Sequence, residues 1–280
     1  MGANPISISP AQRRIIDQIQ VNIPFSMLVE KSWQELFFAL KINPEIGIDA
    51  RALDDFGPPA FKDFAERFHA AGRTVTLHGP FMDLSPGSPD PKIRDVTRLR
   101  FCQLLDAVEI FKPRTVVCHA GYDHERYSFW REEWLEHTIA AWRWLGREIK
   151  NRGSRLMLEN VYEKNPEELL QVLRPLNPAH VRYCLDIGHL TAFSKYPVDR
   201  WIAATGTYIG QLHLHDNRGD QDSHLGMGEG SIDFAPLFHY VRHMDIPPVV
   251  TLEPHQQADF LASLAFLEKS EFPSWFSISS

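Results

Sequence analysis

Cysteine is scarce in this sequence, which restricts how the chain can be stabilised. The 280 residues include three cysteines, none of them in a CxxC spacing. Any pairing scheme would leave one thiol unpaired, so a disulfide framework is not indicated. We therefore expect a reducing compartment, the cytoplasm, as the location.

Long apolar runs and an excess of positive charge are missing as well. No window approaches the roughly 18 consecutive apolar residues of a membrane span, and the first stretch, MGANPISISPAQRRIID, does not suit a secretory signal. We expect no membrane association. The formal net charge of −7 at pH 7 disfavours an extended basic surface for nucleic acid.

The sequence also lacks a Pro/Gly/Ser-rich linker and any low-complexity segment. With 44% hydrophobic and 23% charged residues, its composition is that of a globular protein with a sizeable core. We expect one domain over residues 1–280, with 1–16 and 271–280 as terminal extensions. The aromatic residues of 271–280 would pack on this domain or on a second subunit, and the oligomeric state stays open.

Short β-rich runs alternate with longer amphipathic stretches along the chain. The predicted strands are 19–24, 45–49, 74–79, 115–120, 155–160, 181–186, 209–216 and 248–253. The predicted helices include 59–71, 92–111, 131–152 and 257–268. The helix over 92–111 places its apolar residues on one stripe: Val96, Leu99, Leu104, Leu105 and Val108.

Eight strands alternating with helices within about 250 residues predict an α/β fold, a single (β/α)8 TIM barrel. A doubly wound parallel sheet is the alternative, but it typically uses fewer strands and a glycine-rich first turn. No GxGxxG motif follows the first predicted strand. The barrel is therefore the better prediction.

Histidines and carboxylates gather where the predicted strands end, which is where the active site of such a barrel lies. In chain order they are His78, His119, Glu159, Asp186, His189, His213, His215, Asp222, His224 and Glu253. Any one of them alone would ordinarily be a hydrogen-bonded structural residue or a helix cap. Barrel closure brings them together, however, and converging carboxylates repel one another. Divalent metal ions remove that repulsion, so the pattern predicts a metal site.

Seven short motifs follow the order found in one known superfamily. They are LHGP (77–80), CHAG (118–121), LEN (158–160), LDIGH (185–189), HLHD (213–216), DSHLGMGEG (222–230) and LEP (252–254). Through them the chain resembles the superfamily that joins endonuclease IV-type enzymes to xylose isomerase-like sugar isomerases and epimerases.

This resemblance implies a set of metal ligands. Endonuclease IV-like enzymes hold three metals, and each of their nine ligand positions has a counterpart here. The implied sites are His78, His119 and Glu159; Glu159, Asp186, His213 and Glu253; and His189, Asp222 and His224. The spacing of the residues does not choose between His213 and His215, and the resemblance selects His213. The sugar isomerases resemble the chain only through Glu159, Asp186, His213 and Glu253, around one metal.

The leading hypothesis is metal-assisted hydrolysis of a phosphate ester, chiefly a phosphodiester of a nucleotide-like small molecule. Glu159 and Glu253 are its catalytic carboxylates. The mixed imidazole and carboxylate ligands suit zinc or manganese, and up to three such ions would attract an anionic substrate. Some relatives resemble phosphodiesterases that cleave the nucleotide loop of a cobamide. An abasic-site endonuclease is also considered, but the rim loops mix Arg with Asp, so DNA is less favoured as a partner.

The main alternative is a Mn-dependent sugar or sugar-phosphate isomerase or epimerase. Glu159 and Glu253 would hold one metal and shuttle a proton, with His78 and His119 contacting the substrate. That hypothesis leaves Asp222 and His224 without a role. A barrel that has lost catalysis and serves as a binding protein is a third hypothesis, although no residue is missing from the ligand set.

Three further residues are candidates for contacting substrate: Phe81, His215 and Arg218. Phe81 follows the HGP motif and offers a ring for stacking. Arg218 could hold a phosphate or carboxylate through two parallel bonds, or it could pair with Asp216 or Asp220 at the surface. The proline-rich segment 83–91 is either a lid or a rigid connector.

Overall fold

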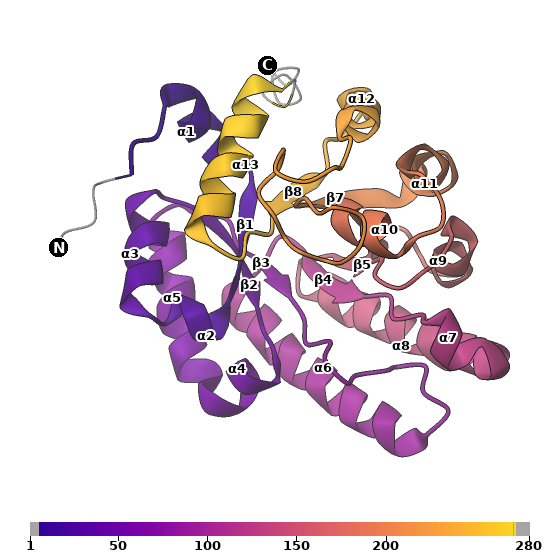
Figure 1. Cartoon of the computed structure of the whole chain (residues 1–280). Helices are drawn as coiled ribbons and strands as arrows, with labels where there is room; N and C mark the ends of the chain where they lie inside the picture. Colours follow the sequence, from indigo (N-terminus) through magenta and orange to yellow (C-terminus); the bar gives the residue numbers. More distant parts are fainter. Residues whose placement is uncertain (1–5, 271, 273–280) are drawn as a thin grey trace.

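The computed structural model describes residues 6–270 and 272, and these form a closed barrel of eight parallel strands ringed by helices (Figure 1). The strands are β1 (Gln20–Pro24), β2 (Asn43–Gly47), β3 (Thr76–His78), β4 (Val116–His119), β5 (Leu156–Glu159), β6 (Val181–Asp186), β7 (Ile209–Leu214) and β8 (Val249–Leu252). They pair in chain order, and β8 closes the barrel on β1. The predicted single (β/α)8 barrel is confirmed.

Most strand residues are buried, because helices cover the strands outside and packed side chains fill the barrel inside. In β4, Val116, Val117 and Cys118 are at most 1% exposed, and every residue of β5 is buried. The last residue of each of these strands is His119 or Glu159. The apolar body of the strand thus anchors a polar side chain at the rim.

Helices follow the strands and form the outer layer. They are α1 (Pro10–Ile16), α2 (Phe25–Leu28), α3 (Lys31–Ala39), α4 (Ala50–Asp55), α5 (Gly57–Ala70), α6 (Pro91–Phe111), α7 (His124–Tyr127), α8 (Arg131–Asn151), α9 (Pro166–Leu173), α10 (Ile187–Phe193), α11 (Val198–Thr205), α12 (Ala235–Arg242) and α13 (Gln257–Lys269), with short 3-10 helices at Ser128–Trp130 and Gly206–Tyr208. Within the described ranges, none of the helices is both long and apolar enough to cross a membrane.

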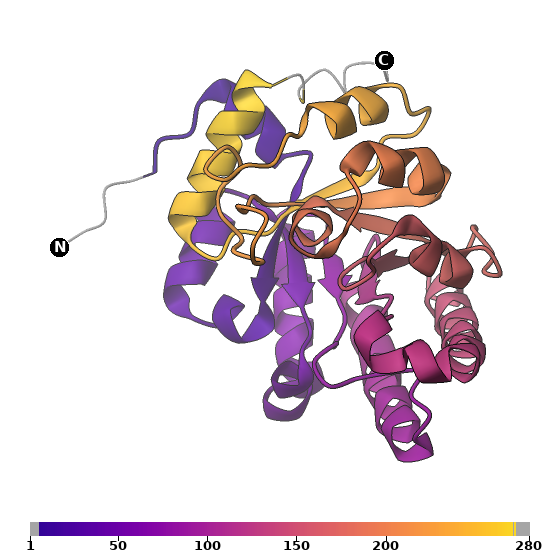
Figure 2. The same ribbon diagram turned by 45° about the vertical axis from the view of Figure 1, so that its right-hand side comes forward.

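Helix α6 departs in part from its predicted apolar stripe. Leu104, Leu105 and Val108 are buried as expected, whereas Val96 and Leu99 are 51% and 59% exposed. The prediction was wrong for the first turns of the helix. The buried face of the helix runs through Thr97 and Phe101 instead, so Val96 and Leu99 lie on its outer side; the helix itself lies in the outer layer (Figures 1 and 2).

Both ends of the described chain join the barrel core. Ser9 caps α1, and its hydroxyl donates to Glu268 Oε1 of α13 over 2.6 Å. Ile15 and Ile16 of α1 are buried in the core, as is Phe272. The expectation for the other aromatic residues of 271–280 lies outside the described residues.

Candidate metal centre

The ends of β3 to β8 bring the predicted ligands into three adjacent groups. Within each group, one possible ligand atom of every residue lies within 4.8 Å of the others. The first ligand group is His78, His119 and Glu159; the second is Glu159, Asp186, His213 and Glu253; the third is His189, His215, Asp222 and His224. All nine residues predicted as ligands therefore meet at one rim of the barrel.

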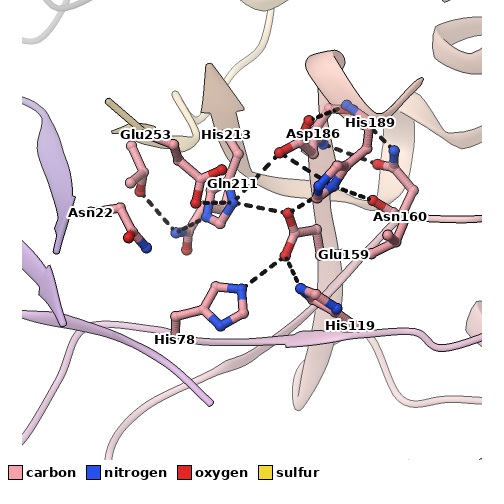
Figure 3. A network of polar contacts seen from close by, with 12 residues as sticks. Asn22, His78, His119, Glu159, Asn160, Asp186, His189, Gln211, His213 and Glu253 are labelled. Carbon is pink, nitrogen blue, oxygen red and sulfur yellow. Dashed lines mark hydrogen bonds and ion pairs between the residues drawn. The ribbon is translucent and has the colours of Figure 1, made fainter. Parts of the chain in front are cut away.

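Glu159 connects the first two groups, as Figure 3 shows. Its Oε2 lies 3.1 Å from His78 Nε2 and 3.5 Å from His119 Nε2. Its Oε1 lies 3.0 Å from His213 Nδ1. The carboxylate is 1% exposed and turns one oxygen to each group, which is the arrangement that a bridging ligand requires.

The third group is built around Asp222. Its Oδ2 lies 3.1 Å from Nε2 of both His189 and His224. The sequence assigned His215 to the substrate, but its Nε2 lies 3.6 Å from Asp222 Oδ1, and its ring stacks on His224 with centroids 3.9 Å apart. His215 is therefore an additional candidate ligand of this group.

Backbone carbonyls orient one histidine of the first group and two of the third. The Nδ1 atoms of His78, His189 and His224 each lie 3.0 Å from a carbonyl oxygen, that of Gly79, Asn160 and Glu253 respectively. A carbonyl can only accept, so Nδ1 carries a hydrogen and Nε2, on the carboxylate side of the ring, is the atom that could bind a metal ion. Histidines that bind metals are oriented in this way.

Sequence reasoning missed Glu45, which orients His213. Glu45 Oε1 lies 2.9 Å from His213 Nε2, so Nδ1 of that ring faces Glu159 and Glu253. Glu45 is fully buried, and Thr76 and Gln211 donate to its other oxygen. The available signal was a glutamate at the start of the second predicted strand.

The charges and unpaired atoms of the site fit divalent metal ions. Burial lowers the pKa of His119 to about 3, so its imidazole is neutral at pH 7 and can act as a ligand. Burial alone would raise the pKa of Asp222, but hydrogen bonds from His189 and His224 lower it, so this group is a carboxylate. His215 Nδ1 and Asp222 Oδ1 are buried without a hydrogen-bond partner among the described residues. Imidazole and carboxylate donors together suit zinc or manganese.

Two local features explain the LDIGH motif. Asp186 is the N-cap of α10, and its Oδ1 accepts from the backbone N–H of His189 over 2.7 Å. An N-cap side chain reaches the backbone N–H three residues later, so the motif places Asp186 and His189 side by side. Gly188 packs against the ring of His215, where a Cβ atom would lie 1.9 Å from Cε1. A larger residue would displace His215 from the third group.

The loop over 217–232, which carries Asp222 and His224, is organised by Asp216. The buried Asp216 carboxylate accepts from the backbone N–H groups of Asn217, Gly228, Gly230 and Ile232 over 2.9 to 3.1 Å. Figures 1 and 2 show this loop (orange) beside α13, in agreement with the close approach of Gly226 and Gly228 to that helix. The glycines of the DSHLGMGEG motif thus let the loop fold around Asp216, which places Asp222 and His224 in the third ligand group.

A cavity of about 350 Å³ opens over the three ligand groups. Aromatic side chains of Phe81, Tyr162 and Phe193 line it together with the ligands. Phe81 is 42% exposed and stacks on His119 with ring centroids 4.2 Å apart, so it lies where the sequence predicted a substrate contact. Arg218 is exposed and does not line this cavity.

The segment 83–91 is held against its neighbours. Tyr127 Oη donates to Ser85 Oγ over 2.9 Å, and the backbone N–H of Ser85 donates to Thr97 Oγ1. Arg94 donates to the carbonyl of Ser88. These bonds favour the rigid connector over the lid.

Comparison with known proteins decides the family. A sequence model described as "Xylose isomerase-like TIM barrel" matches residues 41–270. The chain belongs to the xylose isomerase-like TIM barrel family. The uncharacterized protein MJ1311 of Methanocaldococcus jannaschii is 26% identical to the chain over 202 residues, which cover 70% of this chain and 69% of that protein.

Solved structures extend the comparison of this xylose isomerase-like barrel. The TTHB071 protein from Thermus thermophilus, soaked with ZnCl2, is 26% identical with a TM-score of 0.75, and the match covers 94% of this chain and 99% of that protein. A D-tagatose 3-epimerase-like protein is 22% identical with a TM-score of 0.76, with coverage of 93% and 97%. At that identity the second likeness concerns the fold alone.

Proposed function

We propose that this chain is a metal-dependent phosphoester hydrolase that acts on a phosphodiester of a nucleotide-like small molecule. The cobamide nucleotide loop falls within this substrate class. The proposal rests on the third ligand group beside the other two. A sugar isomerase with a single metal needs only the second group, whereas a polynuclear hydrolase gives His189, Asp222 and His224 a role.

The three ligand groups would hold the metal ions, with Glu159 shared between the first and the second. Bound there, zinc or manganese would polarise the phosphate ester and neutralise charge that develops on the leaving oxygen. The remaining contributions come from the chain itself. Glu253, 8% exposed at the cavity wall, is suited to accept the proton of an attacking water through its carboxylate.

The cavity supports a small substrate rather than a polymer. Its aromatic wall of Phe81, Tyr162 and Phe193 offers flat apolar faces to a base or another ring of the substrate. The net charge of −7 works against tracking a long polyanion. An abasic-site endonuclease is for these reasons the less favoured hydrolase.

A sugar or sugar-phosphate isomerase or epimerase is the second candidate, and the comparisons favour it over the hydrolase. The second ligand group alone matches what that chemistry requires, and the D-tagatose 3-epimerase-like neighbour shares the fold. In this case one metal would be held by the second group, and the carboxylates of Glu159 and Glu253 would move a proton to and from a sugar carbon.

One experiment separates the two candidates. The chain and its His224→Ala variant are reconstituted with zinc or manganese, and metal content is measured by plasma mass spectrometry. Each sample is then assayed on nucleotide and corrinoid phosphodiesters and on a panel of ketose and aldose sugars. His239→Ala, an exposed histidine of α12, serves as the matched control.

The hydrolase proposal predicts about three metal ions per chain and cleavage of a phosphodiester. His224→Ala should abolish this cleavage, and His239→Ala should retain it. One metal equivalent, with epimer or aldose–ketose exchange that survives His224→Ala, would overturn it in favour of the second candidate.

A further inference from the structure

A second cavity lies at the opposite end of the barrel from the metal centre. It measures about 280 Å³ and is bordered by residues at the N-terminal ends of β4 to β8. Its charged residues are Arg114, Lys150, Arg155 and Arg182, and its lining contains no Asp or Glu. We call it the basal pocket. A pocket whose charged residues are all positive is unexpected in a chain of net charge −7.

The four cations of the basal pocket lack acidic partners. Among the described residues, none of these side chains lies within ion-pair distance of an Asp or Glu carboxylate. Other basic side chains nearby are paired, as Arg152 is with Glu148 over 3.2 Å. The positive charge of the pocket is therefore left for something outside the protein to neutralise.

Arg182 is fixed in position by the backbone. Its Nε donates to the carbonyl of Tyr208 over 3.0 Å, and its Nη2 donates to those of Thr207 and Ile209. Its Nη1 has no acceptor among the described residues. A guanidinium held on one edge with the other edge free is preorganised for an anion. Burial and the nearby charge of Arg155 both lower the pKa of Arg182, as expected for two cations that share a pocket.

From this arrangement we infer that the basal pocket binds a small phosphate-type anion, at a site separate from the metal centre. Arg155, Arg114 and Lys150 supply charge around the fixed guanidinium of Arg182. The apolar border of Ile246, Pro247 and Pro248 limits the ligand to one that fits the cavity. A single phosphate group, free or on a small metabolite, has both the negative charge and the small size that the pocket requires. A nucleic acid would need a basic surface that continues beyond the pocket.

Inorganic phosphate is the probe. It is titrated by calorimetry into the metal-loaded protein and into the Arg155→Gln and Arg114→Gln variants. Neither side chain makes a hydrogen bond among the described residues, so both variants should fold, which circular dichroism checks. Arg147→Gln, an exposed arginine that lies on α8 outside the pocket, is the matched control. Crystals soaked in selenate locate the anion by its anomalous signal.

We expect phosphate to bind to the unaltered protein. Arg155→Gln and Arg114→Gln should each weaken this binding by about tenfold, because each variant loses charge-assisted hydrogen bonds to the anion. Arg147→Gln should leave the affinity unchanged. Selenium should lie beside Arg182. Equal affinity in all variants, or selenium at the metal centre alone, would overturn the inference. A short single-stranded oligonucleotide is tested as well. If it binds the protein more tightly than phosphate does, and Arg155→Gln abolishes that binding, the inference of a small-anion site is also overturned.

Discussion

The histidines of the candidate metal centre are oriented by the groups that bind their second ring nitrogen. His78, His189 and His224 each use Nδ1 on a backbone carbonyl, and these carbonyls are fixed by the strand ends and the loops that follow. His213 instead uses a buried carboxylate, Glu45. An anionic partner makes the imidazole a stronger base, and hence a stronger ligand, than a neutral carbonyl does.

Glu45→Gln should weaken metal binding at the second group by about tenfold or more, because the amide cannot polarise His213 as the carboxylate does. Metal affinity is measured by competition with a chelating dye. Thr76→Val is the control, since it removes a bond to Glu45 Oε2 and retains the contact with His213. Equal affinities in the two variants would show that Glu45 does not act through His213.

At the scale of elements, the loops at the rim are held by buried carboxylates that are not themselves predicted ligands. Asp216 gathers the loop over 217–232, and Glu163 joins the loops after β4 and β5 by accepting from the backbone N–H groups of Tyr122 and Val161. Without these carboxyl groups, buried backbone N–H groups of both loops would lack an acceptor, which is costly in free energy.

Asp216→Asn should loosen the loop over 217–232 and empty the third ligand group of metal. The asparagine amide retains one acceptor oxygen, so two backbone N–H groups lose their partner at about 1–3 kcal/mol each. Metal content and hydrogen exchange across the loop measure the effect. Asp233→Asn, an exposed carboxylate that accepts from Ala235 near the start of α12, should change neither, and a fully metallated Asp216→Asn protein would refute the role of Asp216.

Glu163 should make stability depend on pH. Burial raises its pKa from the ordinary value of 4.5 to about 7, so between these values the folded state binds a proton that the unfolded state has lost. The contribution of Glu163 to the free energy of unfolding is fully present below pH 4.5. As the pH rises from 4.5 through 7, the free energy of unfolding falls by about 3 kcal/mol. Urea unfolding of the chain and of Glu163→Gln at pH 5 and pH 8 measures it. An identical pH dependence in both proteins would contradict this assignment.

At the scale of the whole molecule, barrel closure concentrates negative charge. Glu45, Glu159, Asp186 and Glu253 are each at most 8% exposed near the barrel axis or its rim. Buried carboxylates at such short range are costly without cations. Metal ions bound at this rim should therefore stabilise the fold.

Chelation should lower the melting temperature by about 5 °C or more. A site occupied at about 100 times its Kd contributes about 2.7 kcal/mol, and 1 kcal/mol corresponds to roughly 2 °C for a chain of this size. Differential scanning fluorimetry with EDTA, followed by excess zinc, measures the loss and its recovery. A melting temperature that EDTA leaves unchanged would count against bound metal.

Most of the barrel and of the ligand set could be predicted because both depend on local order in the chain. An apolar run that ends in His119 or Glu159 specifies a strand and its rim residue together, and parallel strands place all such residues at one edge. Helix α6 shows the limit of this reasoning: Val96 and Leu99 are apolar but exposed, whereas the polar Thr97 between them lies on the buried face.

What the sequence determined by itself was thus the alternation of strands and helices, and the histidines and carboxylates that gather at one rim of the barrel. The resemblance to a known superfamily then selected nine of these residues as ligands. Only the tertiary structure brought His215 into the third group, set Glu45 behind His213, left Arg218 away from the cavity and assembled the basal pocket. Each of these depends on residues from different strands or loops meeting in space. Their distances are set by barrel closure and loop packing, which no local pattern in the chain encodes.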